Sequence, residues 1–188
     1  MTHDELEELL EQIQGHYLEQ FENAIAKYEH ENIILEPALR YSSGEIATEG
    51  RLRLPARVDF VVLDGADRSP ISSVNIDSKT LIQFGVTDFL LEGSDIRVVP
   101  FSWDWITLRS DLKIVAADAV VESWFAVAFK KNEGLAPPFF SCAHFISEPE
   151  IIDGICEVRL DAGSSPPDMV MALLDQMIGA GAKRISIG

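Results

Sequence analysis

Residues 155–187, with the sequence ICEVRLDAGSSPPDMVMALLDQMIGAGAKRISI, predict a strand, a helix and a second strand in succession. We expect the strands over 155–160 and 184–187. In the helix, Ser165 can cap the first turn, Pro166 suits its first position and Asp168 stands at the capping-box position. Strand, helix and strand in this order form a βαβ crossover, which is right-handed in almost all proteins. The expected buried face of the helix is Met169, Val170, Leu173, Leu174, Met177 and Ile178.

The residues before this unit predict a β-hairpin and, further upstream, another helix. Asp153-Gly154 is a strong tight-turn signal between 151–152 and the strand that starts at Ile155. A further strand is expected over 139–146. Residues 114–131 predict a helix with a broad apolar face that includes Val120, Trp124 and Phe125, ended by the glycine and prolines that follow.

Residues 33–113 are rich in strand signals and lack a long helical stripe. Apolar and β-branched runs occur over 58–63, 74–84, 86–91 and 96–101, separated by turn residues. Residues 92–95 have the length of a hairpin connection. An antiparallel meander is the simplest prediction for this part.

The first 31 residues predict one long amphipathic helix. Leu6, Leu10, Ile13, Tyr17 and Phe21 follow each other at steps of three and four, as expected for one buried stripe. The opposite face is mainly Glu and Gln. Its acidic positions, which we take as a candidate binding surface, are Glu8, Glu11, Glu19 and Glu22.

Together these segments predict one α+β domain over residues 1–188. It would contain the N-terminal helix (1–31), a strand-rich part (33–113), a second helix (114–131) and a C-terminal unit of hairpin, helix and strand (139–188). We prefer a largely antiparallel sheet to a doubly wound one, because the strand signals cluster between 51 and 113 and do not alternate with helices.

The chain is acidic, which limits its partners. It has 31 acidic and 15 basic side chains and a net charge of −16. Such a chain should repel phosphate backbones and anionic membranes, so we expect no direct nucleic-acid or membrane binding and allow a basic protein partner. The acidic start at Thr2-His3-Asp4-Glu5 lacks the features of a secretion signal. We therefore expect a cytoplasmic protein in which Cys142 and Cys156 are buried free thiols.

The most unusual local feature is the aromatic segment Phe101-Ser102-Trp103-Asp104-Trp105. In an exposed strand, Phe101, Trp103 and Trp105 would share one face and could bind a partner or a ligand. The simpler interpretation, which we prefer, is that these rings fill the core. Asp104 could be a cap, a salt-bridge partner of Arg109, or a carboxylate with a raised pKa in an apolar pocket.

Cys142-x-His144 places a thiol and an imidazole on one face of the strand expected at 139–146. This is the chemistry of an activated nucleophile or of a partial metal site. No third ligand is identifiable in the sequence, and adding Cys156 would give three ligands where a structural zinc site needs four. We therefore predict no metal, no cofactor and no catalytic residue.

Two further patterns have ordinary explanations. Gly163-Ser164-Ser165 precedes a helix but lacks the Lys and the glycine spacing of nucleotide-binding loops, so capping is expected. Close carboxylate pairs, such as Asp59 with Asp64, arise by chance in a chain with 31 acids.

Three classes of function stay open. The first and preferred one is a non-catalytic protein-binding domain, either an immunity-type inhibitor of a basic protein or an accessory subunit. The second is an enzyme with a pocket near Trp103, Asp104, Trp105 and His144. The third is a structural domain that forms a homodimer through its first helix.

Overall fold

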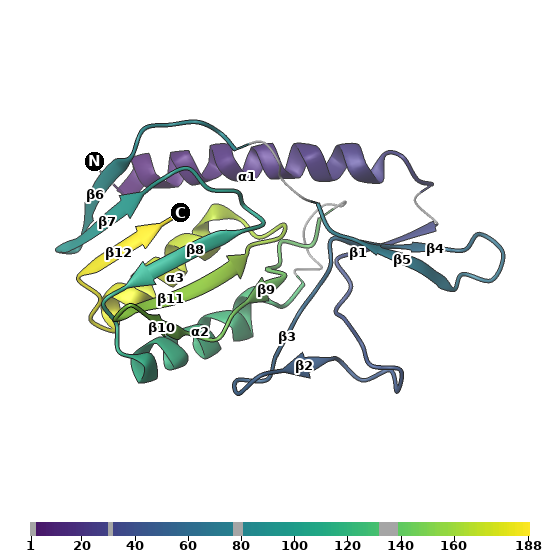
Figure 1. Cartoon of the computed structure of the whole chain (residues 1–188). Helices are drawn as coiled ribbons and strands as arrows, with labels where there is room; N and C mark the ends of the chain where they lie inside the picture. Colours follow the sequence, from purple (N-terminus) through teal and green to yellow (C-terminus); the bar gives the residue numbers. More distant parts are fainter. Residues whose placement is uncertain (1–2, 30–31, 77–80, 132–138) are drawn as a thin grey trace.

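The computed structural model describes residues 3–29, 32–76, 81–131 and 139–188, which form an α+β fold (Figure 1). The helices in these residues are α1 (His3–Ile25), α2 (Ile114–Ala128) and α3 (Pro167–Gly179). The strands are β1 (Ile33–Leu35), β2 (Thr48–Glu49), β3 (Leu54–Pro55), β4 (Phe60–Leu63), β5 (Pro70–Val74), β6 (Thr87–Leu91), β7 (Ser94–Val98), β8 (Ile106–Ser110), β9 (Phe145–Ile146), β10 (Glu150–Ile152), β11 (Ile155–Asp161) and β12 (Arg184–Ile187).

The main sheet has seven strands in the order β10-β11-β8-β12-β7-β6, with the short β9 also paired to β11. Strands β11 and β12 are both antiparallel to β8, so they run parallel to each other on its two sides. Helix α3 connects them, which confirms the predicted strand, helix and strand. The meander predicted for 33–113 is wrong in part, because β12 inserts between β7 and β8 and pairs in parallel with β7.

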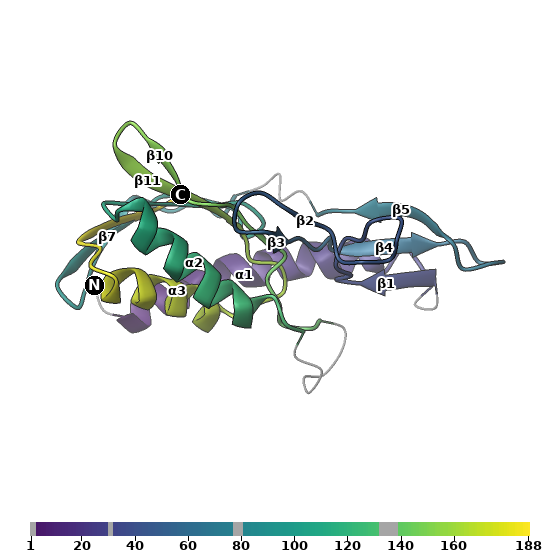
Figure 2. The same cartoon turned by 90° about the horizontal axis from the view of Figure 1, so that it is seen from below.

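All three helices lie on the same side of this sheet, as Figure 2 shows. Side chains on that side, such as Ile96, Leu108 and Ile185, are almost completely buried and meet α3 residues such as Leu174. Because successive side chains of a strand point to opposite faces, the alternate positions point away from the helices. They include charged residues such as Arg97, so the helix-free face of the sheet is polar.

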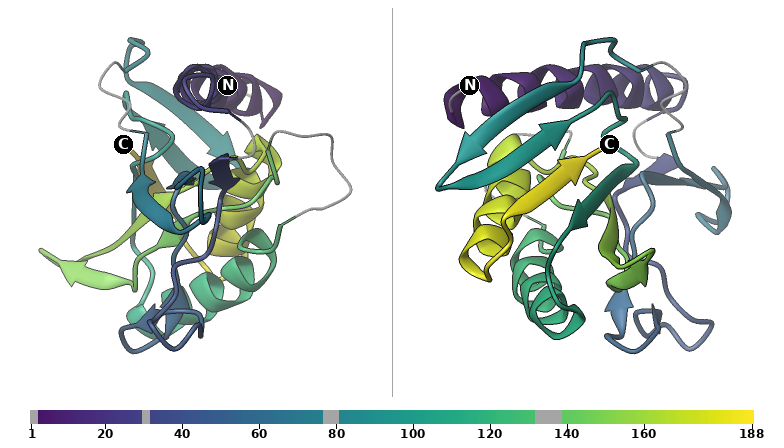
Figure 3. Two further views of the ribbon diagram at one scale, coloured as in Figure 1. Left: turned by 90° about the vertical axis from the view of Figure 1, so that its right-hand side faces the viewer. Right: turned by 60° about the vertical axis from the view of Figure 1, so that its left-hand side comes forward.

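A second, three-stranded sheet of β1, β4 and β5 lies near the C-terminal end of α1, away from the main sheet (Figures 1 and 3). Helix α1 contacts α3 and β6 near its start. Further along, Phe21 stacks on Phe60 of β4 with ring centroids 6.1 Å apart. The apolar stripe of α1 therefore joins the two sheets into one core.

Helix α1 is shorter than predicted and uses its apolar stripe inside the chain. It ends at Ile25 and is followed by a turn, while residues 30–31 lie outside the described part. The predicted stripe is confirmed by the burial of Leu6, Leu10, Ile13, Tyr17, Phe21 and Ile25. These side chains pack within the molecule. Whether α1 forms a homodimer stays a prediction. None of the described helices has the length and hydropathy of a membrane-spanning segment.

Several local predictions need correction. The strand predicted over 74–84 is wrong apart from Val74, which is the last residue of β5; residues 77–80 lie outside the described part. Only Phe145–Ile146 of the strand predicted at 139–146 is present. Ser165 does not cap α3, because Pro166 occupies that position and the Ser165 hydroxyl donates to the carbonyl of Ala162.

Two predicted hairpins are confirmed together with their turn chemistry. Glu92-Gly93 joins β6 to β7, and Asp153-Gly154 joins β10 to β11. All four turn residues have positive φ values, between 48° and 80°, as expected of two-residue hairpin turns. The β10–β11 hairpin rises from the sheet on the side opposite the helices (Figure 2).

The aromatic segment forms a tight turn between β7 and β8. The amide of Trp105 donates to the carbonyl of Ser102 at 3.1 Å. Phe101 and Trp103 are buried, and the Trp103 indole donates to the carbonyl of Gly163 at 3.0 Å. Trp105 is 58% exposed. The turn therefore sends the two tryptophans into opposite environments, and the exposed three-ring ladder does not form.

This difference gives a test of the fold. We expect Trp103→Ala to lower the free energy of unfolding by about 3–5 kcal/mol, because it leaves a cavity in the core, and Trp105→Ala to change it by about 0.5 kcal/mol or less. Urea unfolding followed by circular dichroism measures both values. Equal losses for the two variants would contradict the described turn.

Candidate functional site

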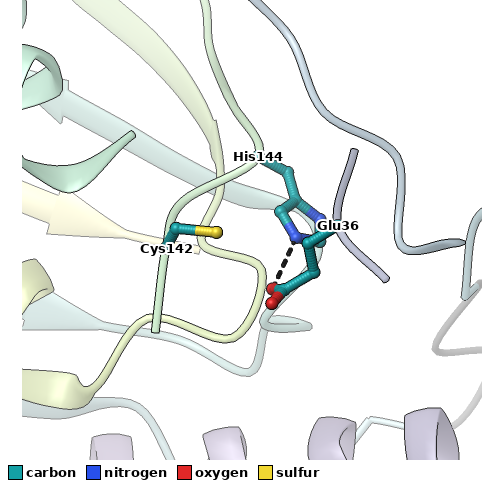
Figure 4. A group of neighbouring side chains, drawn as sticks. All are labelled: Glu36, Cys142 and His144. Atoms are coloured by element: carbon teal, nitrogen blue, oxygen red, sulfur yellow. Dashed lines mark hydrogen bonds and ion pairs between the residues drawn. The ribbon is translucent and has the colours of Figure 1, made fainter. Parts of the chain in front are cut away.

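Three potential metal-ligating side chains from distant parts of the sequence meet in the core: Glu36, Cys142 and His144 (Figure 4). Glu36 follows β1, while Cys142 and His144 lie in the segment before β9. All three are fully buried. Their nearest ligand atoms, a carboxylate oxygen, Sγ and an imidazole nitrogen, lie within 4.8 Å of one another. We call these residues the buried triad.

One side of the His144 ring is paired with Glu36. His144 Nε2 lies 2.9 Å from Glu36 Oε1. The amides of Phe140 and Ser164 also donate to this carboxylate, at 2.8 and 3.3 Å. Burial alone would raise the pKa of Glu36, but His144 and the two amides outweigh burial and lower this pKa. Glu36 is therefore a carboxylate held in its charged form.

The other side of the ring faces two aspartates. His144 Nδ1 lies 3.4 Å from an Asp59 oxygen and 3.8 Å from an Asp161 oxygen. Asp59 is also the acceptor for the Tyr17 hydroxyl and for the amide of Ile76. Burial opposes charge on His144, yet its neighbours Asp59, Cys142, Glu36 and Asp161 together raise its pKa well above the ordinary value.

The neighbouring acidic groups respond to the same burial. Burial raises the pKa of Asp161 to about 7, aided by the charge of Asp59 and opposed by that of His144. Burial, together with Asp59, also raises the pKa of the Tyr17 hydroxyl well above its usual value. The raised pKa of His144 and the lowered pKa of Glu36 thus favour an imidazolium beside a carboxylate.

The backbone around the buried triad is unusual at three places. Glu36 and Ser141 are not glycines but have φ values of 47° and 53°. Such conformations are uncommon and cluster at functional sites. At Gly163, with a φ of 55°, a Cβ atom would lie 2.4 Å from the His144 ring and 2.6 Å from the Cys142 carbonyl oxygen. Only glycine lets this loop close over the imidazole.

The sequence prediction for Cys142 and His144 was partly wrong. These residues are not in a strand, and the third group that the sequence did not identify is Glu36, more than a hundred positions away from both. Cys156 lies elsewhere, on β11 opposite Ser110 of β8, and burial raises the pKa of its thiol. The Cys/Cys/His arrangement considered from the sequence is therefore absent among the described residues.

The buried triad can hold a proton or an ion but, as it stands, cannot bind a substrate molecule. Its members have no solvent-accessible surface. The cavity beside Phe101 and Trp103 has a volume of only about 10 Å³, room for roughly one water molecule. Asp104 is half-buried and Trp105 points outward. Whether this aromatic segment serves an enzyme pocket stays a prediction.

The acidic residues predicted to bind a partner lie together on α1. Glu8, Glu11, Glu19 and Glu22 are all exposed, on positions away from the buried stripe. Whether they bind a partner stays a prediction.

A large hollow lies on the face of the main sheet that carries no helix. Its volume is about 700 Å³, and it extends across β6, β7, β12 and β8 to the start of β11. We call this surface the open sheet face; residues that line it include Asp88, Arg97, Arg109, Asp111, Ile155 and Arg184. The three arginines are paired with carboxylates: Arg97 with Asp88 at 2.9 Å, Arg109 with Glu157 at 2.9 Å and Arg184 with Asp111 at 3.5 Å.

Exposed apolar side chains lie at both ends of the open sheet face. The β10–β11 hairpin carries Ile152 and Ile155, which pair with each other on the same face as Glu157 and are 40% and 46% exposed. Toward the other end of β8 and β11, the Arg159 guanidinium lies 5.9 Å from the centre of the Trp105 ring. Sequence analysis predicted this hairpin but did not assign it to a binding surface, because the pairing that brings it and Trp105 to one face is a property of the sheet.

The residues that surround His144 were also missed, although one signal was present. Asp59 is a single charged residue within the apolar run Val58 to Leu63. Burying a charged side chain costs free energy unless hydrogen bonds or an opposite charge compensate it. The position of Asp59 therefore suggests a buried polar network. Nothing in the sequence indicates that Glu36 or Tyr17 belongs to it.

Comparisons of the chain with protein-family models, with curated proteins and with solved structures found no match.

The close contact at Gly163 leads to a prediction with a matched control. Gly163→Ala should lower the free energy of unfolding by about 3 kcal/mol, since it combines a left-handed alanine with a clash against His144. Gly154→Ala has the same backbone penalty at a φ of 80° but open space around it, and should cost about 1 kcal/mol. Urea unfolding measures both; similar values would show that His144 does not pack against Gly163 as described.

Proposed function

We propose that this chain is a non-catalytic protein-binding domain that uses the open sheet face to contact its partner. The observation that carries the proposal is a broad hollow with exposed apolar side chains at both ends and no covering helix in the described residues. A sheet that packs one face on the core normally exposes polar residues on the other. Exposed Trp105, Ile152 and Ile155 depart from that pattern.

The side chains of the open sheet face suit recognition better than catalysis. Exposed Trp, Tyr and Arg are the residue types that contribute most to protein–protein affinity, and here Trp105 lies beside Arg159. The arginines within the hollow are neutralised by neighbouring carboxylates. A partner would therefore gain affinity mainly from apolar burial, with the ion pairs fixing its orientation.

The net charge of −16 supports a basic protein as the partner. Long-range attraction follows the total charge and accelerates association, whereas affinity depends on the contact itself. The exposed acids of α1 would contribute to the attraction. Inhibition of a basic protein, as by an immunity protein, and service as an accessory subunit both fit this description. Two free, buried cysteines are in keeping with a cytoplasmic location.

The test begins with capture of partners from the native cell extract at low salt, followed by affinity measurement with the purified partner. We expect a basic protein whose affinity falls about 30-fold with Trp105→Ala, equivalent to a loss of about 2 kcal/mol. Ile155→Ser should weaken binding less.

A control variant separates the effect of the contact surface on affinity from the effect of long-range electrostatic attraction on association. The variant with Glu8, Glu11, Glu19 and Glu22 all changed to Gln should slow association and reduce its salt dependence while leaving dissociation nearly unchanged. Unchanged affinity in both Trp105→Ala and Ile155→Ser would show that the open sheet face is not the contact surface. An acidic partner would contradict the charge argument.

A further inference from the structure

We propose that the buried triad of Glu36, Cys142 and His144 is a zinc site. The three residues supply a carboxylate oxygen, a thiolate sulfur and an imidazole nitrogen, which are the donor types that Zn²⁺ uses in proteins. Their ligand atoms lie within 4.8 Å of one another, and Figure 4 shows the Cys142 sulfur and the Glu36 carboxylate on the same side of the chain as the imidazole. Small side-chain rotations would bring all three onto one ion.

The charge of the ligand set suits the ion. When Zn²⁺ binds, His144 loses the proton on Nε2 and Cys142 loses its thiol proton. Two positive charges of zinc then meet one thiolate, one carboxylate and one neutral imidazole, so the zinc and its three ligands are neutral together.

The surrounding residues resemble the support that zinc-bound histidines have. A histidine that binds zinc through one nitrogen usually donates from the other nitrogen to a carboxylate, which fixes the ring. His144 Nδ1 lies 3.4 Å from Asp59, whose other contacts are the Tyr17 hydroxyl and the Ile76 amide. Asp59 is therefore already placed for this role, and it lies on the side of the ring away from Glu36.

The proposed site would join segments that are far apart in the chain. Glu36 comes from the segment after β1, whereas Cys142 and His144 come from the segment before β9. Because the ligands are fully buried, the metal would stabilise the fold. The buried triad supplies three of the four ligands that tetrahedral zinc takes.

The test uses the full-length protein purified with reductant and without chelator. We expect close to one zinc per chain by mass spectrometry, a lower melting temperature after removal of zinc, and recovery when zinc is restored. Replacement by Co²⁺ should produce a near-ultraviolet charge-transfer band from the thiolate. Cys142→Ser should abolish that band, and Asp59→Asn should weaken zinc binding about 10- to 100-fold.

Two controls make the result specific. Cys156→Ser removes the other buried thiol and should leave the band and the stoichiometry unchanged. His3→Ala removes an exposed group of possible ligands, His3, Asp4 and Glu7, at the start of α1, and should also change nothing. If Cys142→Ser fails to fold, the zinc content and the Co²⁺ spectrum of the natural protein decide. No zinc and no thiolate band in the natural protein, or a band that survives in folded Cys142→Ser, would overturn the proposal.

Discussion

The buried pairing of His144 with Glu36 is the interaction on which the arrangement of this protein depends most. It joins the loop after β1 to the segment before β9, and through Asp59 it reaches Tyr17 of α1. Removing one partner of such a pair typically costs about 3–5 kcal/mol, because the other is left as an uncompensated buried charge. The pair therefore stabilises one particular placement of the second sheet against the rest of the molecule.

The same region is closed by contacts that come from all parts of the chain. Gly163 packs on the His144 ring, and its carbonyl accepts the indole hydrogen of buried Trp103. The side chain of Gln14 on α1 donates to the carbonyl of Ser165 at 2.7 Å. Loop, helix and aromatic turn thus depend on one another, which explains how a cluster of buried charges can be held without solvent.

The two faces of the main sheet have different roles: one contributes to stability and the other is proposed to contact a partner. One face is covered by α1, α2 and α3 and contributes most of the core. The other carries paired charges across β6, β7, β12 and β8, bordered by exposed isoleucines and Trp105. Substitutions on this second face should disturb the core little, so that binding can vary while the fold is kept. The proposed zinc site would contribute to stability, and the open sheet face would contribute to recognition.

The sequence by itself determined the features that depend on local periodicity and turn chemistry. These are the α+β class, the apolar stripe of α1, the presence of α2 and α3, a hairpin connection within residues 92–95 and the turn at Asp153-Gly154. Only the tertiary structure decided which strands are neighbours and which distant side chains meet. Long-range packing decides that β12 inserts between β7 and β8 and that Glu36 approaches His144. The residues that neighbour each of these segments in the sequence do not indicate such packing. The exposure of Trp105 beside buried Trp103 has the same origin, since a turn of the chain separates the two rings.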